Sequence, residues 1–400
     1  MLALALIAAA IWAGMLLFWH GFWRADQRLP EAVPGPAAQR HRVVAVIPAR
    51  NEAACIGPVL EAHAATTYDG TFSVVLVDDN STDATRAIAE RAAKESARPI
   101  TVVAGAPLPE GWSGKLWALA QGISAAPETD YLLLTDADIV HAQGTLSRLV
   151  ALAESRGLAL ASLMARLETG RPGAGWSIGR LLVPAYVFFF QKLYPFPAIN
   201  DPGASHAGAA GGCMLVRRDA LEAIGGIAAM RDALIDDCTL AAALKGMRRG
   251  GERPERRPIW LGLARDEVIS LRDTGALGTI WETVARTAFP QLRRSWLLLA
   301  GCTLGMGFVY LAPPIAAFGG ALAGNAGTAA AGLLGWGLMA LAFWPTLRLY
   351  DGRVWEASAL PLAAVLYMAM TLDSARRDLM GKASPWKGRT YSAMNRRPKA

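Results

Sequence analysis

The feature that most constrains the fold is a pair of short apolar segments that each end abruptly in carboxylates. Residues 74–77 read Val-Val-Leu-Val and are followed by Asp78 and Asp79. Residues 131–135 read Tyr-Leu-Leu-Leu-Thr and lead into Asp136-Ala137-Asp138. A short apolar run bounded by turn-forming residues is typical of a buried strand. Because ligands of an open α/β sheet collect at the carboxyl ends of its strands, we expect both acidic clusters to face one crevice.

The second cluster predicts a cation site. Alternate residues of an extended backbone point to the same side, so Asp136 and Asp138 can share one cation. Carboxylate oxygens suit Mg²⁺ or Mn²⁺, which also neutralise the charge of a bound diphosphate. We expect Asp138 to contact the metal directly. The alternative interpretation of this motif is a solvent-exposed turn.

Strands and helices alternate along the first part of the chain. The apolar patterns predict strands at residues 43–47, 73–77, 100–103 and 131–135, with helices at 56–65, 83–94 and 114–125. This alternation predicts a doubly wound, mostly parallel α/β sheet. Beyond residue 160 the alternation weakens, and we expect strands at 159–165 and 212–216 and a helix at 236–244.

Apolar segments at both ends predict membrane helices. Apolar residues make up 53% of the 400 residues, and residues 2–19, 295–347 and 357–372 carry no charge. Because a span needs about 20 apolar residues, we expect an N-terminal transmembrane anchor over residues 1–23 and two or three C-terminal membrane helices over 291–375. A cleaved signal peptide is the alternative for the first segment, but that segment lacks a basic start and a small-residue cleavage site.

The net charge of +7 is better explained by the membrane topology of the chain than by binding of a nucleic-acid partner. Basic residues flank the apolar segments, in the linker at 24–41 and in the basic tail at 376–400. By the positive-inside rule, the soluble domain at 42–290 lies in the cytoplasm. The chain has no aromatic-interleaved basic surface, so we expect no nucleic-acid partner. The four cysteines show no paired spacing, which indicates neither a disulfide framework nor a zinc site.

Five short motifs carry a resemblance to a known family. They are Pro48-Ala49-Arg50-Asn51-Glu52, Val77-Asp78-Asp79-Asn80-Ser81-Thr82-Asp83, Gly114-Lys115-Leu116-Trp117-Ala118-Leu119, Asp136-Ala137-Asp138 and Ile235-Asp236-Asp237. Their order and spacing resemble the family 2-like GT-A glycosyltransferases, in the membrane-bound branch of ceramide glucosyltransferase-like enzymes. The tail and residues 200–213 are most similar to the hopene-associated glycosyltransferases of bacterial hopanoid pathways. The resemblance covers residues 43–297.

The resemblance implies a role for individual residues. The residues that would bind the nucleotide-diphosphate sugar donor are Asn51, Glu52, Asp78, Asp79, Lys115, Asp136, Gln291 and Arg294. Asp138 and Asp136 would hold the metal. Asp237 would be the general base, preceded by Asp236 where the family commonly has Glu. The structural alternatives are helix capping for Asp83 and Asp237, helix-dipole stabilisation for Glu52 and a surface position for Lys115.

A further motif, Gln291-Leu292-Arg293-Arg294-Ser295-Trp296, resembles the Gln-x-x-Arg-Trp signature of processive and lipid-acceptor members. It departs from that signature because one residue separates Arg294 from Trp296. A juxtamembrane anchor is the alternative. The aromatic stretch at 176–197 predicts either an interfacial helix on the bilayer or a buried core helix.

The resemblance implies a function as well as a fold. We expect an inverting glycosyltransferase of a bacterial-type inner membrane that transfers one sugar from a nucleotide-diphosphate sugar to a lipid hydroxyl. The lipid acceptor would be a hopanoid, a sterol-like lipid or a sphingoid lipid. The alternatives are a processive polysaccharide synthase, a non-catalytic membrane scaffold on the same fold and, more distantly, a nucleotidyltransferase.

Overall fold

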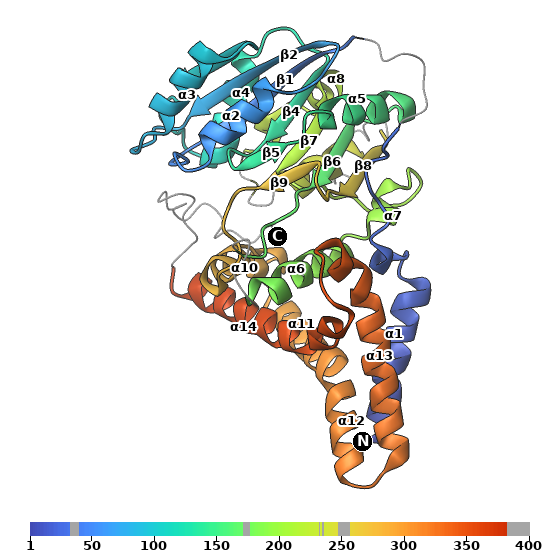
Figure 1. The fold of residues 1–400 in the computed structure, drawn as a ribbon. Coiled ribbons are helices and arrows are strands. Elements are labelled where there is room, and N and C mark those ends of the chain that lie inside the picture. Colours follow the sequence, from blue (N-terminus) through green and yellow to red (C-terminus); the bar gives the residue numbers. More distant parts are fainter. Residues whose placement is uncertain (33–39, 171–176, 232, 234–235, 247–256, 382–400) are drawn as a thin grey trace. The chain divides into compact units, whose positions relative to one another are not determined.

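The computed structural model describes residues 1–32, 40–170, 177–231, 233, 236–246 and 257–381. These residues form two compact units (Figure 1). We call residues 27–167 and 198–272 the sheet unit, and residues 1–26, 168–197 and 273–381 the helical unit. The helical unit therefore includes residues 168–197 and 273–290, which the sequence assigned to the soluble domain.

In the described part of the chain, a seven-stranded sheet forms the centre of the sheet unit. Its strands lie in the order β3-β2-β1-β4-β7-β6-β8. Its strands are β1 (Arg42–Ala49), β2 (Thr71–Asp78), β3 (Ile100–Ala104), β4 (Tyr131–Thr135), β6 (Leu160–Met164), β7 (Cys213–Arg217) and β8 (Ile259–Leu263). All neighbouring pairs are parallel except those of β7, which is antiparallel to β4 and β6. The central strands β1 and β4 are buried along almost their whole length, as in a sheet whose two faces are both covered by helices. The predicted mostly parallel α/β sheet is confirmed.

Helices connect the strands of this unit. They are α2 (Ile56–Ala64), α3 (Thr85–Glu95), α4 (Gly114–Ala125), α5 (Thr145–Arg156), α8 (Arg218–Ala223) and α9 (Asp236–Leu244), with the short α7 (Phe196–Asn200) at the unit boundary. Gly122 lets α4 lie close against the sheet, because a Cβ at this position would be 2.4 Å from Val46 Cγ1. A separate antiparallel pair, β5 (Ile139–His141) and β9 (Val268–Ser270), follows the acidic end of β4.

The helical unit contains the apolar segments. Its helices are α1 (Leu2–Phe18), α6 (Gly179–Leu193), α10 (Leu277–Gln291), α11 (Trp296–Met306), α12 (Ala312–Leu322), α13 (Ala326–Leu349) and α14 (Leu360–Leu379). Among the residues that the structure describes, three stretches are long and apolar enough to cross a membrane, namely Trp296–Leu322, Ala326–Leu349 and Val354–Leu379. The α1 helix is apolar but shorter, with 17 residues, and Trp12 Nε1 joins it to Val309 O at 2.9 Å.

Helix α6 carries the aromatic stretch and is packed inside the helical unit. Phe188 is fully buried and stacks edge-on with Phe343 of α13 at 5.4 Å between ring centroids. Gln191 Nε2 donates to Thr346 Oγ1 at 2.9 Å. The hydroxyl of Tyr367 on α14 donates to Leu182 O at 2.8 Å. Of the two interpretations of this stretch, these contacts favour the buried helix.

Candidate active site

The acidic motifs lie at one edge of the sheet because the strands that precede them are parallel neighbours. The register pairs Ala49 at the end of β1 with Asp78 at the end of β2. On the other side of β1, Val46 pairs with Leu134, one residue before the end of β4. The loops that follow these three strands therefore emerge together, as expected for a ligand site of an open α/β sheet.

The loops after β1 and β2 are tied to each other by their own polar groups. Asn51 adopts a left-handed conformation with φ 51°, and its Oδ1 accepts the backbone N–H of Thr82 at 2.8 Å. Arg50 Nη1 donates to Asp79 O at 2.5 Å and lies 3.9 Å from Asp79 Oδ2. The Asp79 side chain is completely buried. Asn51 and Arg50 therefore shape the loop that presents the first acidic cluster.

Asp83 lies one residue before Ala84, the N-cap of α3, and its carboxylate makes structural hydrogen bonds. Its Oδ1 accepts the backbone N–H of Thr85 at 3.0 Å, at the start of α3, and its Oδ2 accepts the N–H of Ala53 at 3.1 Å. Burial works against the charged form, but the hydrogen bonds from Thr85 and Ala53 outweigh it and lower the pKa of Asp83. Asp83 therefore joins the two loops.

Asp136 is paired with a lysine from a different element. Lys115 Nζ lies 2.8 Å from Asp136 Oδ1, and both side chains are partly exposed. Lys115 is the second residue of α4, a helix that begins where Ser113 Oγ accepts the N–H of Leu116 at 3.3 Å. The structure thus brings together the predicted donor-binding lysine and the predicted metal ligand.

Asp138 is buried and has two partners that the sequence did not suggest. Ser270 Oγ, at the end of β9, donates to Asp138 Oδ2 at 2.7 Å. Arg272 Nη2 lies 3.5 Å from Asp138 Oδ1 and 3.4 Å from Glu52 Oε1. Burial lowers the pKa of Arg272, but Asp138, Glu52 and Asp136 outweigh this effect and raise it. In the sequence, these partners are marked only by the polar residues that end the short β-branched run of β9. Their proximity to Asp138 depends on the long-range pairing of β5 with β9.

Asp237 lies at the start of α9 and points to a glycine. Its Oδ2 accepts the N–H of Gly211 at 3.0 Å, and its Oδ1 accepts the N–H of Cys238 at 2.7 Å. A Cβ on Gly211 would lie 3.3 Å from Lys115 Nζ and 3.4 Å from Asp237 Oδ2. Asp237 therefore adjoins the Lys115–Asp136 pair. The backbone of Asp236 begins α9, but its side chain is outside the described part of the chain.

Lys245 fixes the other end of α9. Its side chain is 1% exposed, and Nζ donates to the carbonyls of Ile199, Asp201 and His206 at 2.7, 2.9 and 2.7 Å. These carbonyls belong to the segment that leads to Gly211, so Lys245 ties that segment to the helix of Asp237.

A pair of buried histidines lies behind the acidic edge. His141 Nε2 is 2.9 Å from Thr135 Oγ1, which itself donates to Gly212 O at 2.8 Å. The rings of His63 and His141 are 5.0 Å apart between centroids. Burial lowers the pKa of His63 to about 4. Burial, with a further contribution from His63, lowers the pKa of His141 well below its ordinary value. Both rings are therefore neutral near pH 7.

The acidic edge fits a divalent cation that is shared with a substrate. Among the described residues, no group of three or more His, Cys, Asp or Glu side chains is arranged to hold a metal. A cation that is bound by one or two carboxylates and by substrate phosphates needs no such group. Asp136 and Asp138 offer this smaller set of oxygen ligands.

The two other predicted donor-binding residues, Gln291 and Arg294, belong to the helical unit. Gln291 ends α10, and its Nε2 donates to the hydroxyl of Tyr194 at 2.5 Å. Arg294 Nε pairs with Asp378 Oδ1 on α14 at 3.1 Å. In this structure both residues make contacts that hold helices together.

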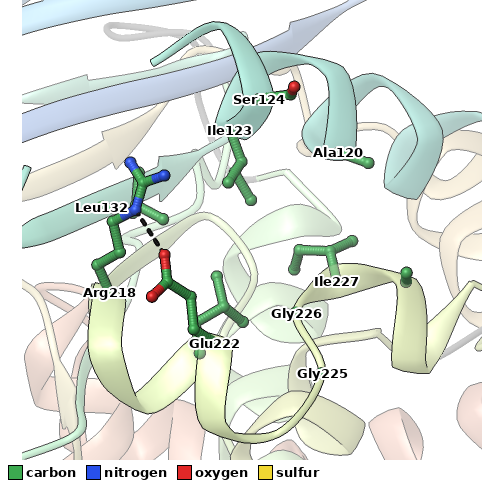
Figure 2. Close-up of a pocket in the computed structure, with 11 residues that line it drawn as sticks. Ala120, Ile123, Ser124, Leu132, Arg218, Glu222, Gly225, Gly226 and Ile227 are labelled. Carbon is green, nitrogen blue, oxygen red and sulfur yellow. Dashed lines mark hydrogen bonds and ion pairs between the residues drawn. The ribbon is translucent and has the colours of Figure 1, made fainter. Parts of the chain in front are cut away.

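A pocket of about 240 Å³ in the sheet unit is separate from the acidic edge (Figure 2). It is lined by Ile123 near the end of α4, by Leu132 near the amino end of β4, and by the turn from Leu221 to Ala228. Figure 2 shows the ion pair between Arg218 and Glu222 in its wall, 2.9 Å long. Ligands of such sheets collect at the carboxyl ends of the strands, so this apolar pocket is not the candidate active site.

Comparison with known proteins identifies a similar family and a similar fold. The profile of Glycosyl transferase family 2 matches residues 44–225. The fold is similar to the mannosyltransferase PcManGT from Pyrobaculum calidifontis in complex with GDP-Man and Mn2+, with a TM-score of 0.53, 22% identity, and coverage of 93% of this chain and 98% of that chain. No curated protein sequence matches the chain.

Two further solved structures align less closely. Glucosyl-3-phosphoglycerate synthase from Mycobacterium tuberculosis, in complex with phosphoglyceric acid, gives a TM-score of 0.41 at 17% identity, over 67% of this chain and 88% of that chain. S. aureus TarS 1-349 in complex with UDP-GlcNAc gives 0.38 at 14% identity, over 85% of this chain and 92% of that chain. The profile match and the GT-A-type sheet make residues 44–225 of this chain similar to glycosyltransferase family 2.

Proposed function

We propose that this protein is a glycosyltransferase that moves a single sugar, with inversion, from a nucleotide-diphosphate sugar to the hydroxyl of a membrane lipid. The observation that carries the proposal is the convergence of the Lys115–Asp136 pair, Asp138 and Asp237. Three segments that are distant in sequence supply a cation for phosphate, two carboxylates for a metal and a further carboxylate for a proton. That combination is what transfer from a diphosphate leaving group requires.

The donor would lie along the loops that follow β1, β2 and β4. The cluster of Asp78 and Asp79 offers acceptor oxygens for a base or ribose. Lys115 lies at the start of a helix, where the backbone also favours anions, and this place suits a phosphate. The similar fold of PcManGT holds GDP-Man and Mn2+, which supports a donor of this class. Asp138 and Asp136 would hold Mg²⁺ or Mn²⁺, which neutralises charge on the leaving diphosphate when bound.

Asp237 would act as the general base. The N–H groups of Gly211 and Cys238 each donate to one carboxylate oxygen, and this fixes the orientation of the group. The acceptor hydroxyl would give its proton to Asp237 while its oxygen bonds to the anomeric carbon. The bond from that carbon to the diphosphate breaks, and its electron pair leaves with the nucleoside diphosphate. Asp236 would support Asp237 from the preceding position.

The helical unit supports a lipid acceptor. Its spanning helices expose large apolar side chains, including Leu297, Leu304 and Leu322 at 82, 74 and 91%, as expected for contact with lipid. The acceptor would be a hopanoid, a sterol-like lipid or a sphingoid lipid. Gln291 and Arg294 would contribute to donor binding from the end of α10. We place the sheet unit on the cytoplasmic side of a bacterial-type inner membrane, in a multi-pass protein.

Lipid mass spectrometry tests the proposal. Cells that express the full chain should gain a lipid that is heavier by one hexose or hexosamine, and cells with Asp237→Asn should not. We expect a loss of at least about 100-fold in turnover, because a positioned base contributes about 10²–10⁴-fold. Asp266→Asn is the control, since Asp266 is 77% exposed.

Each outcome of this experiment has a separate meaning. Mn²⁺-dependent binding of GDP or UDP should survive in Asp237→Asn, since the base does not hold the donor. Full turnover of this variant would remove Asp237 as the base. A longer surface polymer in place of a glycolipid would instead establish a processive synthase.

A further inference from the structure

Both carboxylates of the Asp136-Ala137-Asp138 motif are already paired with cations of the chain itself. Lys115 Nζ is 2.8 Å from Asp136 Oδ1. Arg272 Nη2 is 3.5 Å from Asp138 Oδ1, and Ser270 occupies the other oxygen of Asp138. A divalent cation that arrives alone must therefore displace two positive side chains. This competition is expected to weaken the binding of a metal that arrives without nucleotide.

The contacts of Arg272 are suited to exchange. Its distances of 3.4 Å to Glu52 and 3.5 Å to Asp138 exceed the roughly 2.7–2.9 Å of a tight charge-assisted hydrogen bond. Its side chain is 42% exposed, whereas Asp138 is buried. The guanidinium can thus turn toward a new anion while the carboxylate stays in place. A diphosphate matches the planar fork of an arginine.

We propose that Arg272, together with Lys115, exchanges its carboxylate for the diphosphate of the nucleotide and so releases Asp138 and Asp136 to the metal. This inference rests on the proposed function, because it concerns the same donor site. Its consequence is thermodynamic. The nucleotide and the metal bind synergistically, each raising the affinity of the chain for the other by the same factor.

Metal binding measured with and without nucleotide tests the exchange. Mn²⁺ is titrated into the full chain in detergent, and free Mn²⁺ is followed by electron paramagnetic resonance, alone and with saturating GDP or UDP. For the native chain we expect the nucleotide to tighten Mn²⁺ binding by at least about tenfold, within the usual range of coupling between sites.

Substitution of Arg272 should remove most of this coupling. In Arg272→Gln, Mn²⁺ alone should bind more tightly, because its competitor is gone. The nucleotide should bind more weakly in the presence of Mn²⁺, because its guanidinium partner is gone. The coupling factor should fall at least fivefold. Arg272→Lys should retain part of it. Arg218→Gln, which removes a comparable ion pair in the pocket of Figure 2, should change neither affinity.

The outcomes separate this inference from the proposed function. If neither GDP nor UDP binds at any Mn²⁺ concentration, the proposed donor site is wrong and the exchange falls with it. If nucleotide and Mn²⁺ both bind but without coupling, only the exchange is overturned. An unchanged coupling factor in a folded Arg272→Gln variant, with the melting temperature as the check, removes Arg272 from the mechanism.

Discussion

Acidification should weaken the sheet unit through His63. The ring is 1% exposed, and neither of its nitrogens has a hydrogen-bond partner in the described part of the chain. Burial lowers its pKa to about 4, compared with about 6.5 in an unfolded chain. Between these two values the unfolded state binds a proton and the native state does not. Stability is therefore complete above about pH 6.5 and is lost as the pH falls toward about 4.

The size of this effect follows from the two pKa values. When the pH falls from about 7 to about 5, protonation of His63 alone should lower the free energy of unfolding of the sheet unit by about 2 kcal/mol. At about pH 4 the decrease should reach about 3 kcal/mol. His63→Leu keeps a side chain of similar volume and removes the titrating ring. The difference between native chain and variant, measured at the same pH, gives the contribution of His63 together with its effect on the neighbouring His141.

Hydrogen exchange read by mass spectrometry measures this difference in the full chain. Peptides from α2 and β2 are compared between native chain and His63→Leu at about pH 7 and about pH 5. We expect the ratio of their protection factors to change about 30-fold across this interval, which corresponds to about 2 kcal/mol. His20→Leu is the control, because His20 is exposed in the helical unit. A ratio that stays constant with pH would refute the burial argument.

Two further substitutions test the construction of the site. Gly211→Ala should lower the turnover number at least about tenfold with the fold intact, because its Cβ would lie 3.3 Å from Lys115 Nζ and would displace Lys115 and Asp237. Gly144→Ala is the matched control, because a Cβ at that position meets nothing within 4 Å. Equal turnover of the two variants would contradict the crowding argument. Lys245→Met should lower the free energy of unfolding by at least about 3 kcal/mol, because it leaves buried carbonyls without a donor; thermal melting against the exposed Lys94→Met checks this, and equal melting temperatures would show that water replaces the ammonium.

Local sequence patterns are sufficient to predict the central strands and helices of the sheet unit. The runs at 43–47 and 131–135 are apolar because these strands are buried on both faces. Their burial can therefore be predicted directly from their amino-acid composition. The same logic placed Asp78 and Asp136 at the strand ends. For Asp83, the local pattern indicated a role at the start of the following helix, where its carboxylate accepts the N–H of Thr85.

Contacts between distant segments could not be predicted in this way. Arg272 reaches Asp138 only because β9 pairs with β5 across about 130 residues of chain, and nothing in its local sequence specifies that pairing. Lys245 carries no local signal either, because its partners are backbone carbonyls whose positions depend on how the 198–206 segment folds.

The sequence by itself determined the class of the sheet, the acidic residues at its strand ends and the apolar segments, since each follows from the periodicity of burial or from neighbouring residues. Only the tertiary structure decided which charges meet. It paired Lys115 with Asp136, set Arg272 between Asp138 and Glu52, and grouped residues 168–170 and 177–197 with the apolar helices. The physical reason is that a charge has no preferred partner along the chain. Its partner is fixed only when packing of the sheet and helices brings distant backbone segments together.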